Sequence, residues 1–231
     1  MFDRIELKER AKVSFRANYW KCVLVALILT FIGGGASSGG VNFELNISDN
    51  NINVSSPAEL LPFTALIGSI ALVAVGISII VSIFLLNPLR VGCMRFMRNN
   101  ANGEAVLDDI GTGFKNYWPA VKTMFLSDLY ILLWSLLLIV PGIVKSYSYR
   151  MVPYLVADHP EMSSNEILEC SQAMMEGNRW EAFVLDLSFF GWNLLSGLTM
   201  GLVGLFYATP YQMQTNANLY LELSRTDRFE M

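Results

Sequence analysis

The chain has 231 residues, of which 53% are hydrophobic and only 16% are charged, and its mean hydropathy is +0.42. Soluble domains carry roughly 25% charged residues, because a surface that faces water needs them. The charge deficit therefore argues against an ordinary soluble domain. A net charge of −4 gives no reason to expect a nucleic acid as a partner.

Long stretches without charge predict helices that cross a membrane. One crossing needs about 20 apolar residues, which span about 30 Å of hydrocarbon as a helix. Two stretches, near residues 118–157 and 187–221, are too long for one crossing, and Pro141-Gly142 and residues 196–201 interrupt them. The sequence predicts an all-α bundle in one integral membrane domain, with six spans near residues 19–35, 61–86, 118–140, 141–157, 180–196 and 200–221. Five spans are the alternative, if one hairpin is a single bent helix.

The distribution of basic residues predicts the topology. Lys and Arg concentrate in cytoplasmic loops. They are frequent before residue 22 and between residues 90 and 122, but the predicted outer loop, residues 36–60, has none. Six spans also place Arg179, Arg225 and Arg228 inside, which five spans do not. The sequence thus favours six spans with both termini in the cytoplasm.

The first residues allow two further interpretations. A basic lead and an apolar run resemble a cleaved signal peptide, but the lead is long and contains Asp3, Glu6 and Glu9. Residues 3–16 also fit an amphipathic helix, with Leu7, Ala11 and Phe15 on one face. Such a helix either lies among anionic headgroups or simply anchors the topology.

Two segments outside the predicted spans carry local signals. The outer loop alternates apolar and polar residues and predicts either a small β-hairpin or a flexible loop. On the inner side, residues 162–178 predict a helix, because Ser163 and Glu166 form a capping box and Gly177 can end it.

Charged residues inside the predicted spans form the candidate functional site. They are Asp128, Lys145, Arg150 and Asp186, and each costs about 2.5–3.5 kcal/mol at the centre of a spanning helix unless it finds a partner. Asp128 and Arg150 lie at comparable depths on either side of the Pro141 turn, which predicts an ion pair between them. With Tyr147 these residues make a polar cluster. It indicates either a cavity for a phosphate or carboxylate headgroup or, as we favour, structural contacts between helices.

Signatures of catalysis and metal binding are absent from the sequence. It contains no HExxH, GxSxG or Walker motif. The one histidine, His159, and three distant cysteines, Cys22, Cys93 and Cys170, form no metal-binding pattern, and we interpret the cysteines as reduced packing residues. The sequence therefore predicts no enzyme, no cofactor and no metal.

Several short segments of the sequence are distinctive. They include residues 7–12 (LKERAK), 138–149 (LIVPGIVKSYSY), 154–158 (YLVAD), 171–177 (SQAMMEG), 185–192 (LDLSFFGW) and Pro210-Tyr211. Together they resemble the domain-of-unknown-function 975 family of bacterial membrane proteins and, more distantly, the membrane domain of some glycerophosphodiester phosphodiesterases. The chain has no soluble phosphodiesterase domain, so that activity does not carry over. The resemblance implies a helical bundle in the bacterial cytoplasmic membrane and assigns no substrate.

The function that the sequence favours is a non-enzymatic membrane module. Its expected partners are membrane lipids, with a protein partner or a second copy of the chain as further candidates. The alternative is a small transporter or flippase-like protein that uses Asp128, Lys145 and Arg150 along a polar path. An intramembrane enzyme is a third class, which would need a nucleophile or base facing a cavity.

Overall fold

The computed structural model describes residues 2–33, 69, 73, 76–77 and 80–225. Within these ranges the regular structure is all-helical, with no strand, which confirms the all-α part of the predicted fold class. The predicted outer loop, with its β-hairpin or flexible alternative, and most of the predicted span 61–86 lie outside the described residues.

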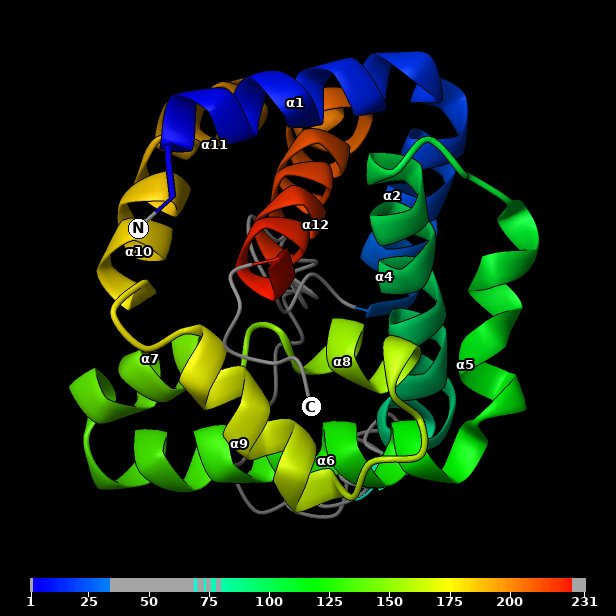
Figure 1. The fold of residues 1–231 in the computed structure, drawn as a ribbon, viewed down its shortest axis with the longest axis vertical. Helices are drawn as coiled ribbons and strands as arrows, with labels where there is room; N and C mark the ends of the chain where they lie inside the picture. The colour runs from blue at the N-terminus through cyan, green and yellow to red at the C-terminus, as the bar shows by residue number, and fades with distance from the viewer. Residues whose placement is uncertain (1, 34–68, 70–72, 74–75, 78–79, 226–231) are drawn as a thin grey trace, which may run out of the picture.

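The described helices surround a central pair, α4 and α12, with α1, α6 and α10 at the rim of the view (Figure 1). Their bounds in chain order are α1 (Arg4–Ala17), α2 (Tyr19–Gly33), the π-helical turn η1 (Ser82–Leu86), α4 (Asn87–Ala101), the 3-10 turn η2 (Leu107–Gly111), α5 (Thr112–Lys115), α6 (Tyr117–Leu137), α7 (Ile139–Ser148), α8 (Val152–Asp158), α9 (Ser164–Met174), α10 (Arg179–Leu187), α11 (Phe190–Leu198), the π-helical turn η3 (Gly204–Ala208) and α12 (Thr209–Arg225).

Helix α1 is amphipathic, but its apolar face lies on protein. The carboxylate of Asp3 caps the helix by accepting from the backbone N–H of Ile5, at 2.8 Å. Leu7, Ala11 and Phe15 are buried, and the Phe15 ring stacks on Tyr211 of α12 with 6.3 Å between centroids. The predicted apolar face thus packs against α12 and not among headgroups. The chain then bends by 100° into α2.

Helices α6 and α7 form the first predicted hairpin, but the chain turns at Leu138 and not at Pro141-Gly142. The chain reverses at Leu138, whose backbone is extended, and Pro141 lies in the first turn of α7, where its missing N–H costs nothing. Gly142 lies so close to α6 that an added Cβ would be 2.2 Å from Ser135 Oγ. The predicted span 141–157 is not one helix, because α7 ends at Ser148 and α8 begins at Val152.

The second predicted hairpin also differs in detail. A break at Ser188 divides the predicted span 180–196 into α10 and α11. The chain turns at Met200 and Gly201, both with positive φ, and then continues through η3 into α12. Pro210 lacks the N–H that would bond the Phe206 carbonyl, and the hydroxyl of Tyr19 donates to that carbonyl at 3.0 Å.

Few of the described helices are long and apolar enough to cross a membrane. Among the described residues, α6 passes that test alone, and α1 with residues 19–30 of α2 passes it as a bent pair. The prediction of six spans is therefore not confirmed.

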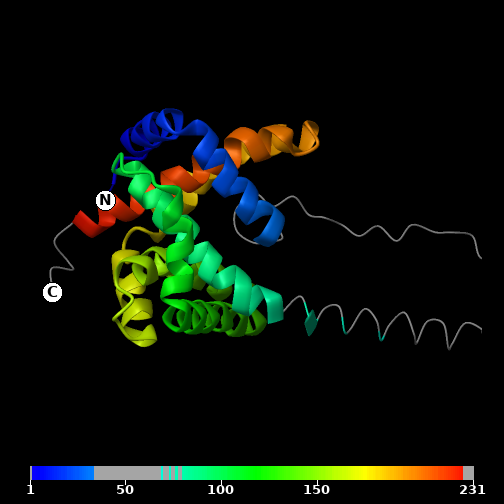
Figure 2. The same ribbon diagram turned by 90° about the vertical axis from the view of Figure 1, so that its right-hand side faces the viewer.

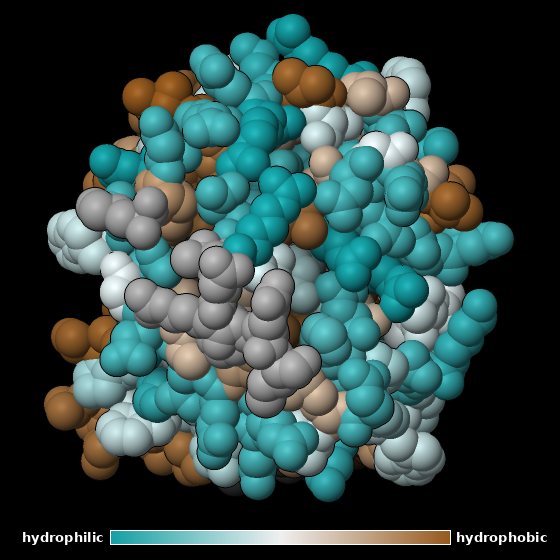
Figure 3. All heavy atoms as spheres, viewed as in Figure 1, coloured by the Kyte–Doolittle hydropathy of each residue, from teal (hydrophilic) through white to brown (hydrophobic). Residues whose placement is uncertain are grey.

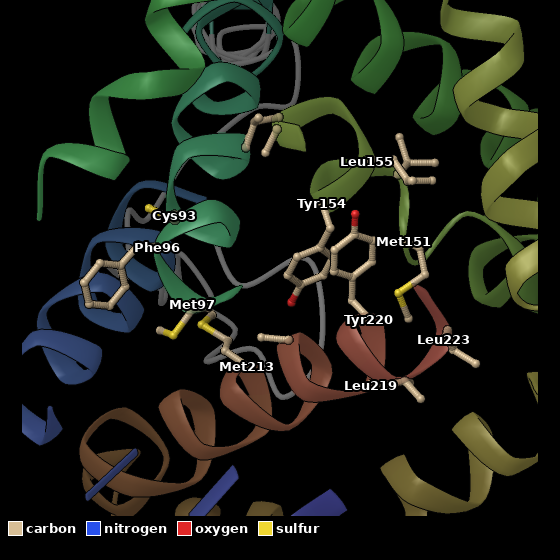
Figure 4. Close-up of a cluster of buried hydrophobic side chains, with 14 of the residues drawn as sticks. Cys93, Phe96, Met97, Met151, Tyr154, Leu155, Met213, Leu219, Tyr220 and Leu223 are labelled. Carbon is tan, nitrogen blue, oxygen red and sulfur yellow. The ribbon is translucent and has the colours of Figure 1, made fainter. Parts of the chain in front are cut away.

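The hydrophobic core lies where α4, α8 and α12 meet, and Figure 4 shows part of it. In that view the rings of Tyr154 and Tyr220 lie face to face with their hydroxyls pointing in opposite directions, and their centroids are 5.1 Å apart. The capping box of Ser163 and Glu166 is present as predicted, and it begins α9.

Candidate functional site

Arg150 occupies the bend between α7 and α8. Helix α7 ends two residues before it, and Pro153 lies in the first turn of α8, so the backbone cannot continue as one helix. The bend directs the guanidinium away from α6 and toward α10 and α12. A straight helix through residues 141–157 would not have placed it there.

The guanidinium of Arg150 forms a two-pronged ion pair with Asp186 of α10. Its Nη1 donates to Oδ2 at 2.8 Å and its Nη2 donates to Oδ1 at 2.7 Å. The same Nη2 donates to Oδ1 of Asn216 on α12, at 2.6 Å. The side chains are 13% and 24% exposed for Arg150 and Asp186, so water screens the pair only in part. Paired N–H donors in this planar geometry give the strongest type of Arg–carboxylate contact.

Two more donors complete the coordination of the Asp186 carboxylate. The hydroxyl of Tyr147 donates to Oδ2 at 3.0 Å, and Nε2 of Gln212 donates to Oδ1 at 3.3 Å. The Arg150 guanidinium also lies over the Tyr147 ring, 5.5 Å from its centroid. We call these five residues, Arg150, Asp186, Tyr147, Gln212 and Asn216, the Asp186 cluster. It joins α7, α10 and α12, and four donors surround its carboxylate.

Lys145 lies apart from the Asp186 cluster. Its ammonium donates to Oε1 of Gln172 on α9, at 2.7 Å. It also lies 5.7 Å from the ring centroid of Trp134 and 5.6 Å from that of Tyr149. The sequence grouped Lys145 with Arg150, whereas the structure gives each a different set of partners.

Asp128 is not the partner of Arg150. It lies on an exposed part of α6, while the guanidinium of Arg150 is engaged by Asp186 and Asn216. The predicted Asp128–Arg150 ion pair is therefore wrong. The prediction assumed two straight antiparallel helices, and the bend after Ser148 removes that assumption.

The partners that sequence reasoning missed are neutral amides. Gln212 and Asn216 are four residues apart, so they lie on one face of α12 inside a stretch without charge. A search for charged residues passes over such pairs. A search for amides at helical spacing in an apolar run would have found both.

A second amide network lies at the centre of the bundle. Nδ2 of Asn100 on α4 donates to Oε1 of Gln214 on α12, at 2.8 Å, and Nε2 of Gln214 donates to the Met97 carbonyl at 3.2 Å. Nδ2 of Asn18 donates to Oδ1 of Asn100, at 2.8 Å. Asn100 and Gln214 are almost fully buried, and every bond here compensates a buried polar group. This network fixes α4 and α12 to the junction of α1 and α2.

A third group of polar contacts surrounds Asp158 at the end of α8. Its carboxylate pairs with the guanidinium of Arg98 on α4 and accepts from the Tyr220 hydroxyl at 2.8 Å. The Arg98 guanidinium and the Tyr220 hydroxyl therefore fasten the end of α8 to both central helices. Among the described residues, no three His, Cys, Asp or Glu side chains gather as they would around a metal ion.

The Asp186 cluster, Lys145 and Gln172 all come from the carboxyl-terminal part of the chain, between residues 145 and 216. A family model described as "Protein of unknown function (DUF975)" matches residues 136–227. Over these residues the chain is similar to the DUF975 family. The family predicted from the sequence is confirmed over these residues, and Asp128 lies outside them.

The other two comparisons add no relatives. No curated protein matches the chain, and no solved structure matches it. The DUF975 match covers all five residues of the Asp186 cluster, and its description assigns no function.

Proposed function

We propose that this protein is a non-enzymatic module embedded in the bacterial cytoplasmic membrane, where it interacts with lipids or with a protein partner. Both termini lie in the cytoplasm in this proposal, as the distribution of basic residues predicts. The observation that carries it is the amount of large apolar side chain that the described residues leave exposed.

These exposed side chains gather on two hairpins. Around the α6–α7 turn, Leu136 is 84% exposed and Ile139 is 76% exposed. Around the α11–η3 turn, Leu198 is 77% exposed and Met200 is 93% exposed. Contiguous apolar surface of this kind is rare on soluble monomers and marks contact with lipid or another protein.

A polar face lies elsewhere on the molecule. Hydrophilic residues cover most of the face in Figure 3, and apolar residues gather toward its rim. This is the face over which α1 and α9 run in Figure 1. On α9, Glu166 and Glu169 are exposed, as an aqueous environment requires. A molecule with one aqueous face and apolar hairpins fits a membrane surface.

The absence of enzymatic activity in this proposal follows from the Asp186 cluster. A general base needs a free lone pair within reach of a substrate, and a nucleophile needs an adjacent base. Four donors occupy the Asp186 carboxylate, and the Arg150 guanidinium has two acceptors. The cluster is suited to holding helices together.

Extraction of bacterial membranes tests the proposal. After expression at a low level, washed membranes are treated with alkaline carbonate and, in parallel, with a mild detergent. We expect the protein to stay in the pellet with carbonate and to enter the supernatant only with detergent. Recovery as a monodisperse protein in plain buffer would overturn the proposal.

A small transporter is the second candidate, and the Asp186 cluster is the observation that favours it. The cluster places an ion pair and two amides among three helices, as a polar path would. A transporter needs water to reach these groups from one side. Labelling of a Tyr147→Cys variant by a small water-soluble maleimide in intact vesicles would support transport, and protection from it would support the closed module.

A further inference from the structure

We infer that the α6–α7 hairpin and the α11–η3 hairpin each enter a single leaflet of the bilayer and return without crossing it. The inference rests on the proposed membrane location. It concerns the depth of four of the six predicted spans, and it names the acyl chains of one leaflet as the partner of the exposed hairpin surfaces.

The return leg of the first hairpin is too short to cross. Lys145 on α7 donates to Gln172, and the hydroxyl of Ser171 donates to the Ser148 carbonyl at 2.8 Å, so this leg is attached to α9. Only six residues separate Lys145 from Ile139 at the turn, which is about 9 Å of helix. The hydrocarbon of a bilayer is about 30 Å thick.

The outgoing leg begins against the same helix. The hydroxyl of Thr123 on α6 donates to Oγ of Ser164 at the start of α9, at 2.9 Å. From Ser164 to Gln172, α9 follows the hairpin for about 12 Å, and the turn extends about 9 Å beyond it. Since Glu166 and Glu169 of α9 are exposed, the base of this hairpin lies no deeper than the headgroups. The turn is therefore near the middle of the bilayer at most.

The second hairpin is attached to the charged helix α1 in the same way. Nζ of Lys8 donates to Oγ of Ser188, just before α11, at 3.0 Å. On the return leg the Tyr211 hydroxyl donates to the Lys8 carbonyl at 3.2 Å. Ten residues separate Tyr211 from Gly201 at the turn, or about 15 Å of helix. Figure 2 shows this turn on the side opposite the carboxyl end of α12.

Both turns consist mainly of apolar residues, which is unusual for a turn in water. Turns on an aqueous surface are rich in Asn, Asp, Ser, Gly and Pro. Residues 136–140 read LLLIV, and residues 198–203 read LTMGLV, without a charge in either. A hairpin that crossed the membrane would expose these turns to water. One that ends among acyl chains buries them.

Exposed indoles mark the level at which the hairpins enter. Trp20, Trp118 and Trp180 are each the second residue of a helix, α2, α6 and α10, and they are 74%, 69% and 70% exposed. These helices begin at three separate places around the rim of Figure 1. Lys21 and Arg179 adjoin two of the indoles and complement anionic headgroups. Trp at the interface, with apolar residues beyond it, is the arrangement of a membrane anchor.

Cysteine labelling at the turns tests the inference. We would introduce Ile139→Cys and Met200→Cys separately into a Cys170→Ser background, since Cys22 and Cys93 are buried. A membrane-impermeant maleimide is applied to spheroplasts, which expose the outer side, and to inverted vesicles, which expose the inner side. Ser48→Cys in the predicted outer loop and Glu176→Cys, exposed next to α9, are the controls for the two sides.

We expect Ser48→Cys to react only from outside, Glu176→Cys only from inside, and the two turn variants from neither side until detergent is added. Reaction of the turn variants from outside would show that the hairpins cross and would overturn the inference alone. Reaction from inside would place the turns in water and overturn it too. Recovery of the protein in the carbonate supernatant would overturn the proposed function itself.

A second measurement separates acyl chains from a protein partner, which would also protect the turns. After detergent labelling, a bimane at position 139 or 200 is reconstituted in vesicles of brominated phosphatidylcholine. We expect bromines near the ends of the acyl chains to quench it more than bromines near the glycerol. No quenching by either lipid would mean that protein covers the turn, and the inference would fail.

Discussion

At the scale of single residues, the ion pair between Arg150 and Asp186 makes the sharpest prediction. Replacing Asp186 with alanine removes the carboxylate and leaves the largely buried guanidinium without a counter-charge. Breaking a buried pair in this way costs on the order of 3 kcal/mol. We expect Asp186→Ala to lower the thermal unfolding midpoint of the protein in detergent.

The matched control is Asp108→Asn, because Asp108 is exposed in the η2 turn. That variant should unfold at the temperature of the wild type. The swap Arg150→Asp with Asp186→Arg should recover part of the loss. A large loss from Asp128→Asn, with none from Asp186→Ala, would support the pairing first predicted from the sequence and contradict the structure.

The sequence identified the charged members of the site but not their pairing. Asp186 and Arg150 both stand out because charge is expensive in an apolar helix. Their contact depends on the bend after Ser148 and on the packing of α10 against α7, which local sequence does not encode. Gln212 and Asn216 were missed because neutral amides leave no mark in a search for charge.

At the scale of an element, the capping box of α9 predicts a pH-dependent contribution to stability. The backbone N–H of Ser163 donates to Oε2 of Glu166 at 2.8 Å, and the backbone N–H of Glu166 donates to the Ser163 hydroxyl at 3.4 Å. Hydrogen bonding of the Glu166 carboxylate to the backbone and side chain of Ser163 lowers the pKa of Glu166 below its ordinary value of 4.5. A lowered carboxyl pKa stabilises the fold above the unfolded pKa, and this contribution is lost as the pH falls through the folded pKa.

We therefore expect Glu166→Gln to be less stable than the wild type at neutral pH, and the difference to shrink as the pH falls below 4.5. Thermal melts followed by circular dichroism in detergent measure it. Ser163→Ala should cost about 1 kcal/mol, as loss of a helix cap does. Glu169→Gln, a neighbour on the same helix outside the box, is the control and should match the wild type at every pH.

Helix positions were easier to predict than helix lengths. Charge-free runs located α2 and α6 within three residues, and the capping box located α9, whereas α12 begins nine residues after the predicted start of its span. The spans 141–157 and 180–196 each proved to be two helices. Pro153 is a local signal for the bend at Arg150, whereas the break at Ser188 has no strong local signal. Tertiary bonds, such as that from Lys8 to Ser188, hold these breaks in place.

At the scale of the whole molecule, three polar networks hold the helices together, so the fold does not depend on contacts made by the hairpin turns. The amide network around Asn100, the Asp158 contacts and the Asp186 cluster hold α4, α8, α10 and α12 together without help from the hairpin turns. In the proposed membrane location, the turns are thereby left to contact lipid. A count of apolar residues cannot separate such hairpins from full crossings, because acyl chains solvate both.

Tryptophan fluorescence can measure how deep different parts of the molecule lie in the bilayer. A variant with Trp134→Phe and Trp192→Phe retains Trp20, Trp118 and Trp180, the exposed indoles at helix starts. In vesicles of brominated lipid, we expect its fluorescence to be quenched more by bromines near the glycerol than by bromines near the chain ends. The reason is that indoles prefer the headgroup level.

The complementary variant replaces Trp20, Trp118 and Trp180 with phenylalanine and retains Trp134 on α6 and Trp192 on α11. These two indoles lie closer to the hairpin turns than the helix starts do, so bromines near the chain ends should quench them more than they quench Trp20, Trp118 and Trp180. Opposite depth profiles in the two variants would place the helix starts at the interface and the hairpins below it. Identical profiles would mean that the indoles do not mark one level, and the orientation drawn from them would be wrong.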